Sequence, residues 1–138
     1  MRTKTKLNTK YPLAQFIFFL IIVMTFLQSC DPSYKVEWKV INNTDQNITI
    51  YSKTWQDNTE KYNSLSPNTT LLLMEEYNIG IVKSQFKYTE ETPFYYLLIL
   101  NSNSDTLKTD VHLTKNWNEK NINNEIAEYT LVVSKDEF

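Results

Sequence analysis

The one cysteine of the chain, Cys30, ends the stretch Leu27-Gln28-Ser29-Cys30 at the close of an apolar run. No second cysteine occurs in the 138 residues, so an intramolecular disulfide is excluded. A thiolate is a strong nucleophile and forms a stable thioether. A lone thiol at the boundary between two segments is therefore a candidate for covalent modification. A free thiol in an exported chain would require an explanation. The alternative is a buried, unreactive cysteine.

Other residues suited to catalysis or metal binding are few. His112 is the only histidine, which excludes an H-E-x-x-H motif and a multi-histidine zinc site. Asp110 and His112 would point to the same face of a strand, but such a pair is more often solvated, and we expect no metal. The adjacent pairs Glu75-Glu76 and Glu90-Glu91 would each split between opposite faces of a strand, so we interpret them as loop or edge charges.

Glycine-dependent motifs are excluded by composition. Gly80 is the only glycine, so a P-loop, a dinucleotide fingerprint and a G-x-S-x-G elbow cannot occur. Together with the isolated histidine, this predicts a protein that is not an enzyme and that binds no cofactor.

The first 29 residues differ in composition from the rest. Four basic residues precede an apolar segment, 11–27, and no acidic residue lies before Cys30. A basic start, an apolar core and a short polar exit are the order of a secretory signal peptide. A retained transmembrane helix is the alternative, but it needs about 20 predominantly apolar residues. The uninterrupted core from Phe16 to Leu27 is shorter, which favours a cleaved signal.

Leu27, Gln28, Ser29 and Cys30 together resemble the lipobox of bacterial lipoproteins. The resemblance covers residues 1–30. It implies that a diacylglyceryl group is attached to the Cys30 thiol, that signal peptidase II cleaves between Ser29 and Cys30, and that an N-acyl chain such as palmitate follows. The implied organisation is a cleaved signal peptide (1–29), a lipidated cysteine with a short tether (30–33) and a domain (34–138). The family places such a domain in the bacterial cell envelope.

The membrane that holds the anchor stays open. Asp31 resembles an inner-membrane retention signal of some Gram-negative lipoproteins, but other groups do not follow that rule. We favour the outer membrane, on its periplasmic or surface face. Removal of the signal leaves ten basic against 16 acidic residues, a balance of −6. This argues against a nucleic-acid partner, because such binding depends on Lys and Arg neutralising phosphates.

Periodicity predicts strands through most of the mature chain. Residues 34–41 alternate apolar Tyr, Val, Trp and Val with Lys, Glu and Lys, which is typical of a strand with one buried face. Residues 47–55 follow after an Asn-rich turn, and we expect the two to form a hairpin. Asparagine is expected to replace glycine in the turns. Further strands are expected at 69–75, 94–100, 106–113 and 127–134, with 78–83 as a short neighbour.

Two of these segments carry more detailed expectations. Residues 94–100 are uniformly apolar and predict a central strand buried on both faces, whereas 106–113 should turn Leu107, Val111 and Leu113 inward. Residues 114–128 are polar and form either a helical turn or a loop. Six or seven short strands predict an all-β, antiparallel two-sheet sandwich that resembles the immunoglobulin kind, with a small barrel as the alternative.

Aromatic residues are the remaining functional candidates. Tyr51, Trp55 and Trp117, with Tyr62 and Tyr95, could form an exposed platform for a protein or glycan, although packing in the core or at strand ends is the favoured interpretation. The sequence therefore predicts a lipid-anchored envelope protein that acts as a non-catalytic binding or structural module. An inhibitor or immunity-type envelope lipoprotein is the alternative.

Overall fold

The computed structural model describes residues 16–18, 20, 33–79, 90–123 and 125–138. The chain divides into two compact units, Met1–Asp31 and Pro32–Phe138. In the first unit, the described residues at positions 16–18 and 20 are helical. The second unit contains all of the strands that the structure describes.

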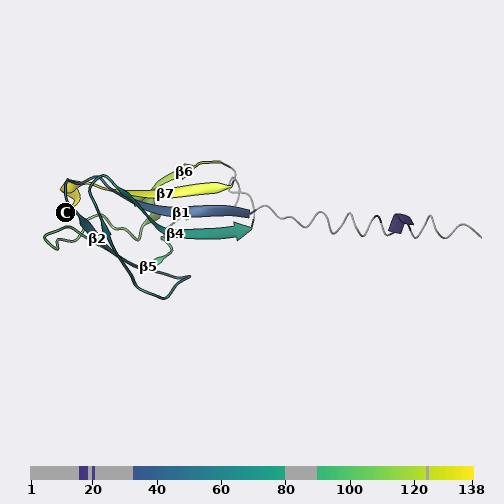
Figure 1. Ribbon diagram of the computed structural model, residues 1–138, viewed down its shortest axis with the longest axis horizontal. Helices are drawn as coiled ribbons and strands as arrows, with labels where there is room; N and C mark the ends of the chain where they lie inside the picture. Colours follow the sequence, from purple (N-terminus) through teal and green to yellow (C-terminus); the bar gives the residue numbers. More distant parts are fainter. Residues whose placement is uncertain (1–15, 19, 21–32, 80–89, 124) are drawn as a thin grey trace, which may run out of the picture. The chain divides into compact units, whose positions relative to one another are not determined.

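The described residues of the second unit form seven strands in two sheets (Figure 1). A four-stranded sheet has the order β4-β1-β7-β6 and a three-stranded sheet the order β3-β2-β5. The strands are β1 (Ser33–Asn42), β2 (Ile48–Thr54), β3 (Lys61–Leu65), β4 (Thr70–Ile79), β5 (Phe94–Leu100), β6 (Asn118–Asn121) and β7 (Ile126–Val133). Two short 3-10 helices, η1 (Thr114–Asn116) and η2 (Lys135–Glu137), complete the described elements of this unit.

This arrangement confirms the predicted all-β sandwich, and the sheets are not closed into a barrel. One detail of the prediction is wrong, because the sheets are not wholly antiparallel. β1 pairs with β7 in parallel, in register from Lys35 with Ile126 to Asn42 with Val133. The first and last strands of the domain therefore lie side by side at the centre of the larger sheet. The likeness to immunoglobulin domains stays a prediction.

The core is formed by the inward side chains of both sheets, and the predicted alternation of β1 is confirmed. Its apolar residues, Tyr34, Val36, Trp38 and Val40, are buried. The Trp38 ring stacks on that of Tyr129 with centroids 4.3 Å apart. Aromatic burial of this kind contributes much of the stability of a small domain that has no disulfide.

The expected hairpin between residues 34–41 and 47–55 is wrong, because β1 and β2 belong to different sheets. The buried side chain of Asn42 explains the crossing. Its Nδ2 donates to the carbonyl oxygens of Gln46 and Leu65, each at 2.9 Å, and its Oδ1 accepts from the backbone N–H and the hydroxyl of Thr44. The amide thereby joins the end of β1 to β3 of the opposite sheet and satisfies its own buried polar atoms.

The predicted bounds of β5 are correct, but its expected position is wrong. β5 is an edge strand of the three-stranded sheet, and its tyrosines, Tyr95 and Tyr96, are exposed. The uniform apolar composition of this strand does not reflect burial on both faces. It reflects one face in the core and one aromatic face toward solvent.

Residues 106–113 do not form the expected strand. Isolated bridges attach the segment to the chain at both ends, Leu100 with Thr106 and Glu91 with Leu113. Between these bridges the Asp110 carboxylate accepts the backbone N–H of the residue two positions further on, at 3.0 Å, and the chain turns. The predicted inward residues Leu107 and Val111 are buried, while Leu113 is only half-buried.

Three further segments differ from the expectations. β3 was not predicted because its residues are few, polar and mostly exposed, and β6 within 114–128 has four exposed residues. The predicted strand at 69–75 continues to Ile79, so it includes the start of the 78–83 segment; residues 80–83 lie outside the described residues. Asn68 has φ 56°, which confirms an asparagine in a left-handed turn position.

Candidate binding surface

The outer face of the three-stranded sheet is the candidate site. A sheet face with many apolar groups on the solvent side differs from the usual polar outer face of a sandwich. Lys53 is the one charged residue among those that point outward. By strand alternation and register, the outward residues are Thr49, Tyr51 and Lys53 of β2, Tyr62 and Ser64 of β3, and Tyr96, Leu98 and Leu100 of β5.

Two tyrosines face each other across neighbouring strands of this face. Tyr51 and Tyr62 are register partners, and their rings meet edge to face with centroids 5.2 Å apart. Tyr62 is 63% exposed. Tyr62 therefore presents its ring to solvent, and the Tyr51 ring packs against it.

A bulge adds further aromatic side chains. The β2–β5 register shifts between Lys53 and Thr54, so that Tyr95 is the extra residue of β5. Tyr95 is 72% exposed, and Trp55, directly after β2, is 50% exposed. Because a bulge redirects side chains at the margin of a sheet, it exposes two successive tyrosines of β5. We call Tyr51, Trp55, Tyr62, Tyr95 and Tyr96 the aromatic face.

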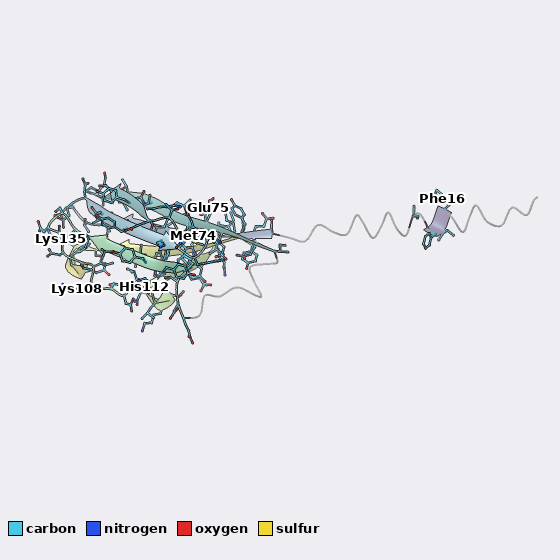
Figure 2. The ribbon with its side chains drawn as sticks, turned by 90° about the horizontal axis from the view of Figure 1, so that it is seen from below. Phe16, Met74, Glu75, Lys108, His112 and Lys135 are labelled. Atoms are coloured by element: carbon cyan, nitrogen blue, oxygen red, sulfur yellow. The ribbon has the colours of Figure 1, made fainter. Side chains whose placement is uncertain are left out.

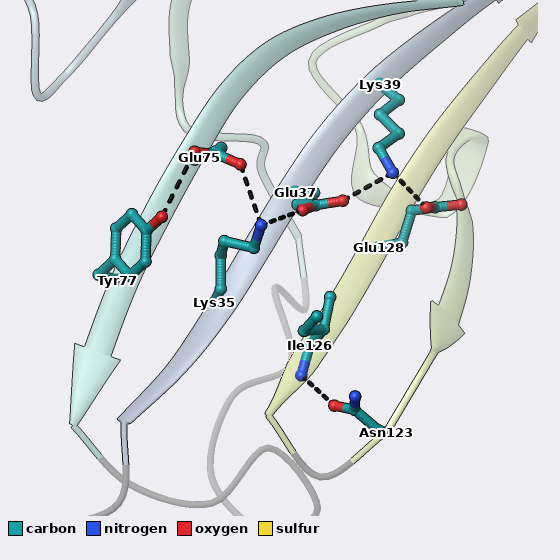
Figure 3. Close-up of polar contacts among 8 residues, drawn as sticks. All are labelled: Lys35, Glu37, Lys39, Glu75, Tyr77, Asn123, Ile126 and Glu128. Carbon is teal, nitrogen blue, oxygen red and sulfur yellow. Dashed lines mark hydrogen bonds and ion pairs between the residues drawn. The ribbon is translucent and has the colours of Figure 1, made fainter.

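The outer face of the four-stranded sheet is charged instead (Figure 3). Glu75, Glu37 and Glu128 stand in one cross-strand row on β4, β1 and β7. Three like charges in a row would repel one another, but Lys35 and Lys39 lie on either side of Glu37. We call these five residues the ion ladder.

Each lysine of the ion ladder joins two carboxylates. Lys35 contacts Glu37 and, at 3.0 Å, Glu75, and Lys39 contacts Glu37 and Glu128, both at 2.6 Å. Hydrogen bonds from the two lysines lower the pKa of Glu37, and the bond from Lys39 lowers the pKa of Glu128. The bonds to carboxylates raise the pKa of both lysines. These two carboxylates are thus held ionised and are unsuited to act as proton donors.

Trp117, one of the predicted patch residues, is not part of the aromatic face. It is 4% exposed, and its ring meets Trp38 edge to face at 5.0 Å and stacks on Phe94 at 5.9 Å. Its indole N–H donates to the Val111 carbonyl at 3.0 Å. For Trp117 the favoured interpretation of core packing is correct.

The other predicted aromatic candidates do lie at the surface. Trp55, Tyr62 and Tyr95 are exposed, whereas Tyr51 is half-buried between its neighbours. The interpretation as core or strand-end packing is therefore wrong for Trp55, Tyr62 and Tyr95. Tyr96 was not predicted as a surface residue, because an unbroken apolar run has no polar alternation to distinguish its outward residues; its register with Lys53 places it on the outer face.

The charged and histidine candidates are not assembled into a site. Asp110 and His112 lie in a turn rather than on one face of a strand, and Figure 2 shows His112 away from Glu75. Within the ranges that the structure describes, no group of three or more His, Cys, Asp or Glu could hold a metal ion. Glu75 and Glu76 split between opposite faces of β4, as predicted, but only the exposed Glu75 is a surface charge, because Glu76 is buried. Burial, followed by the charge of Glu76, raises the pKa of Tyr34.

Two cavities among the described residues lie outside the aromatic face. One, of about 230 Å³, is lined by the loop after β2 and by residues 72–75 of β4, and includes Asp57 and Lys61. The other, of about 220 Å³, lies beside the first residues of β1 and is lined in part by Tyr77 and Ile126. Neither contains the Asp110–His112 pair, so neither supplies the pocket that would favour an acid-base enzyme at that pair.

The lipobox residues Leu27, Gln28, Ser29 and Cys30 lie outside the described residues. Among the residues that are described, no helix is long and apolar enough to cross a membrane. No family model, curated protein or solved structure matches the chain.

Proposed function

We propose that the chain is an exported lipoprotein of the bacterial cell envelope, acylated at Cys30, whose sandwich domain is a non-catalytic module that binds another protein. The aromatic face is the observation that carries this proposal. Exposed apolar patches mark interaction surfaces, and among the described residues of the second unit Tyr77 is the one other ring of comparable exposure.

The composition of the face favours a protein over a glycan. Interfaces between proteins are enriched in Tyr and Trp and depleted in charge at their centre. Leu98 and Leu100 add aliphatic area beside the rings, and Lys53 is the one charge. A sugar site also needs carboxylate or amide groups for the hydroxyls, and the outward residues of these three strands include none. The complementary partner surface is apolar, with an acidic group opposite Lys53.

The anchor is tested by labelling growing cells with an alkyne fatty acid. We expect label on the wild-type chain and none on Cys30→Ala, which is also expected to lose membrane sedimentation. Ser29→Ala serves as the matched control, because a small residue is kept before the cysteine. Equal labelling of the wild type and Cys30→Ala would overturn the anchor.

The binding face is tested by a photo-crosslinking amino acid placed in the full chain in the cells that produce it. We expect a discrete adduct from positions 62 and 95 and none from positions 37 and 128 of the ion ladder. The adduct is then identified by mass, and Tyr51→Ser is expected to reduce its yield. Adducts from both faces alike, an adduct with a second copy of the chain, or a glycan adduct would overturn the proposal.

A further inference from the structure

We infer that the end of the domain where β1 begins carries a second membrane contact, formed by Tyr77, Ile79 and Ile122, which inserts into the headgroup layer and sets the orientation of the domain. We call these three residues the exposed end. The inference rests on the proposed anchoring at Cys30. It concerns a different surface from the aromatic face.

The exposed end borders the first residues of β1. Ile79 is the register partner of Ser33, and Tyr77 and Ile126 are both partners of Lys35. The backbone N–H of Ile122 donates to the carbonyl of Ile126 at 2.9 Å, which places Ile122 at the same end of the sheet, on the opposite side of β1 from Tyr77 and Ile79. Figure 3 shows Tyr77 and Ile126 on either side of β1.

All three side chains of the exposed end are open to solvent. Ile79 is 76% exposed, Tyr77 is 69% exposed and Ile122 is 46% exposed. Two large aliphatic side chains and one ring therefore stand outside the core at a single end of the sandwich. Such area is stabilised when an apolar phase covers it.

The length of the tether brings this end to the bilayer. Ser33 is three residues after Cys30, so even an extended chain separates them by at most roughly 10 Å. Ile79 adds about 5 Å, the spacing of antiparallel partners. The acyl chains on Cys30 would hold that residue at the headgroup layer, so the exposed end lies close to the same layer.

The chemistry of the exposed end suits a lipid interface. A tyrosine ring has an apolar body and a polar tip, and tyrosine is enriched at membrane-water interfaces. The Tyr77 hydroxyl donates to Glu75 at 3.4 Å, which keeps the polar tip beside the charged face of the sheet. Because the mature chain has a formal balance of −6, the contact is expected with zwitterionic lipid rather than through attraction to anionic lipid.

The opposite end of the domain supplies a matched control. Ser102 hydrogen-bonds to Gln46 in the turn after β1, and the neighbouring Asp45 pairs with Lys135 at 2.9 Å. Figure 2 places Lys135 at the end of the domain away from the start of β1. Asn103, exposed in the same turn as Ser102, is therefore a probe position far from the exposed end.

The test uses the full lipidated chain reconstituted in phosphatidylcholine vesicles. Since acylation consumes the one native thiol, Ile79→Cys or Asn103→Cys provides a single site for an environment-sensitive dye. We expect blue-shifted emission and quenching by nitroxide-labelled lipid at position 79, and neither at position 103. A dye at Tyr77→Cys should behave like that at position 79.

Three outcomes would overturn the inference. If the chain sediments with vesicles but the dye at position 79 emits as in water, the anchor stands and the contact does not exist. A blue shift without quenching by lipid nitroxides would indicate a protein contact instead. A chain whose mass shows no acyl groups on Cys30 would overturn the anchoring and the contact together.

Discussion

The two outer faces of the sandwich have opposite relations to water. On the four-stranded sheet, the charges of the ion ladder are paired with one another across β4, β1 and β7. On the three-stranded sheet, the rings of the aromatic face are largely exposed, and Tyr51 and Tyr62 contact each other. The fold thus completes the interactions of one face and leaves apolar area on the other. A protein partner is therefore to be sought on the aromatic face.

The largest expected effect separates an aromatic residue of the core from one of the aromatic face. Trp117→Ala should reduce the free energy of unfolding by about 3–5 kcal/mol, because it leaves a cavity beside Trp38 and Phe94. Trp55→Ala, at a half-exposed position, should change it by about 0.5 kcal/mol. Urea unfolding of the Cys30→Ala chain, followed by circular dichroism, measures both. Equal losses would mean that the aromatic face is a structural element.

Local sequence patterns correctly predicted much of the fold. The alternation in β1 correctly predicted that Trp38 points toward the core and Glu37 toward solvent, because a strand with one buried face has a period of two. The bounds of β5 were also correct, since an apolar run ended by Pro93 and by polar residues limits a strand. The same alternation made Tyr51 and Trp55 candidates for one face.

Sheet partners and exposed strands could not be read from such patterns. A strand buried on one face has the same pattern in either sheet, so the sequence does not show that the chain crosses between the sheets after β1. The buried amide of Asn42, which bonds to Leu65 of the opposite sheet, stabilises this crossing. β6 carries no apolar residue, and its pairing with β7 determines its structure. Trp117 was ambiguous because an aromatic residue in a polar segment suits both a surface and a core.

Acid should break the ion ladder and leave the aromatic face unchanged. The folded pKa values of Glu37 and Glu128 are lowered, so their pairing adds stability above the unfolded value of about 4.3 that is lost as pH falls through the folded values. We expect the free energy of unfolding of the wild type to fall more steeply from pH 5 to pH 3 than that of Glu37→Gln. At pH 7, Glu37→Gln should cost roughly 1 kcal/mol.

A matched variant isolates this effect from other carboxylates. Asp57 pairs with Lys61 at 3.2 Å outside the ion ladder, and both side chains are about half exposed. Hydrogen bonds from Thr59, and then from Lys61, also lower the pKa of Asp57, so Asp57→Asn should reduce the acid slope as well, but less than Glu37→Gln does, because solvent screens an exposed pair. If Glu37→Gln reduces the slope no more than Asp57→Asn does, the ladder contributes no more to stability than an exposed pair, and the contrast between the faces is one of composition alone.

The smallest expected effect concerns the one ring pair of the aromatic face. A double-mutant cycle with Tyr51→Ser and Tyr62→Ser should give a coupling energy of about 0.5 kcal/mol, because an exposed edge-to-face pair stabilises a sheet weakly. The same unfolding measurement applies. A coupling above about 2 kcal/mol would show that the rings are retained for stability, and their exposure would then need no partner. A small coupling, together with loss of the crosslinked adduct, would assign the pair to binding, since the residues would contribute more to the interaction than to the fold that presents them.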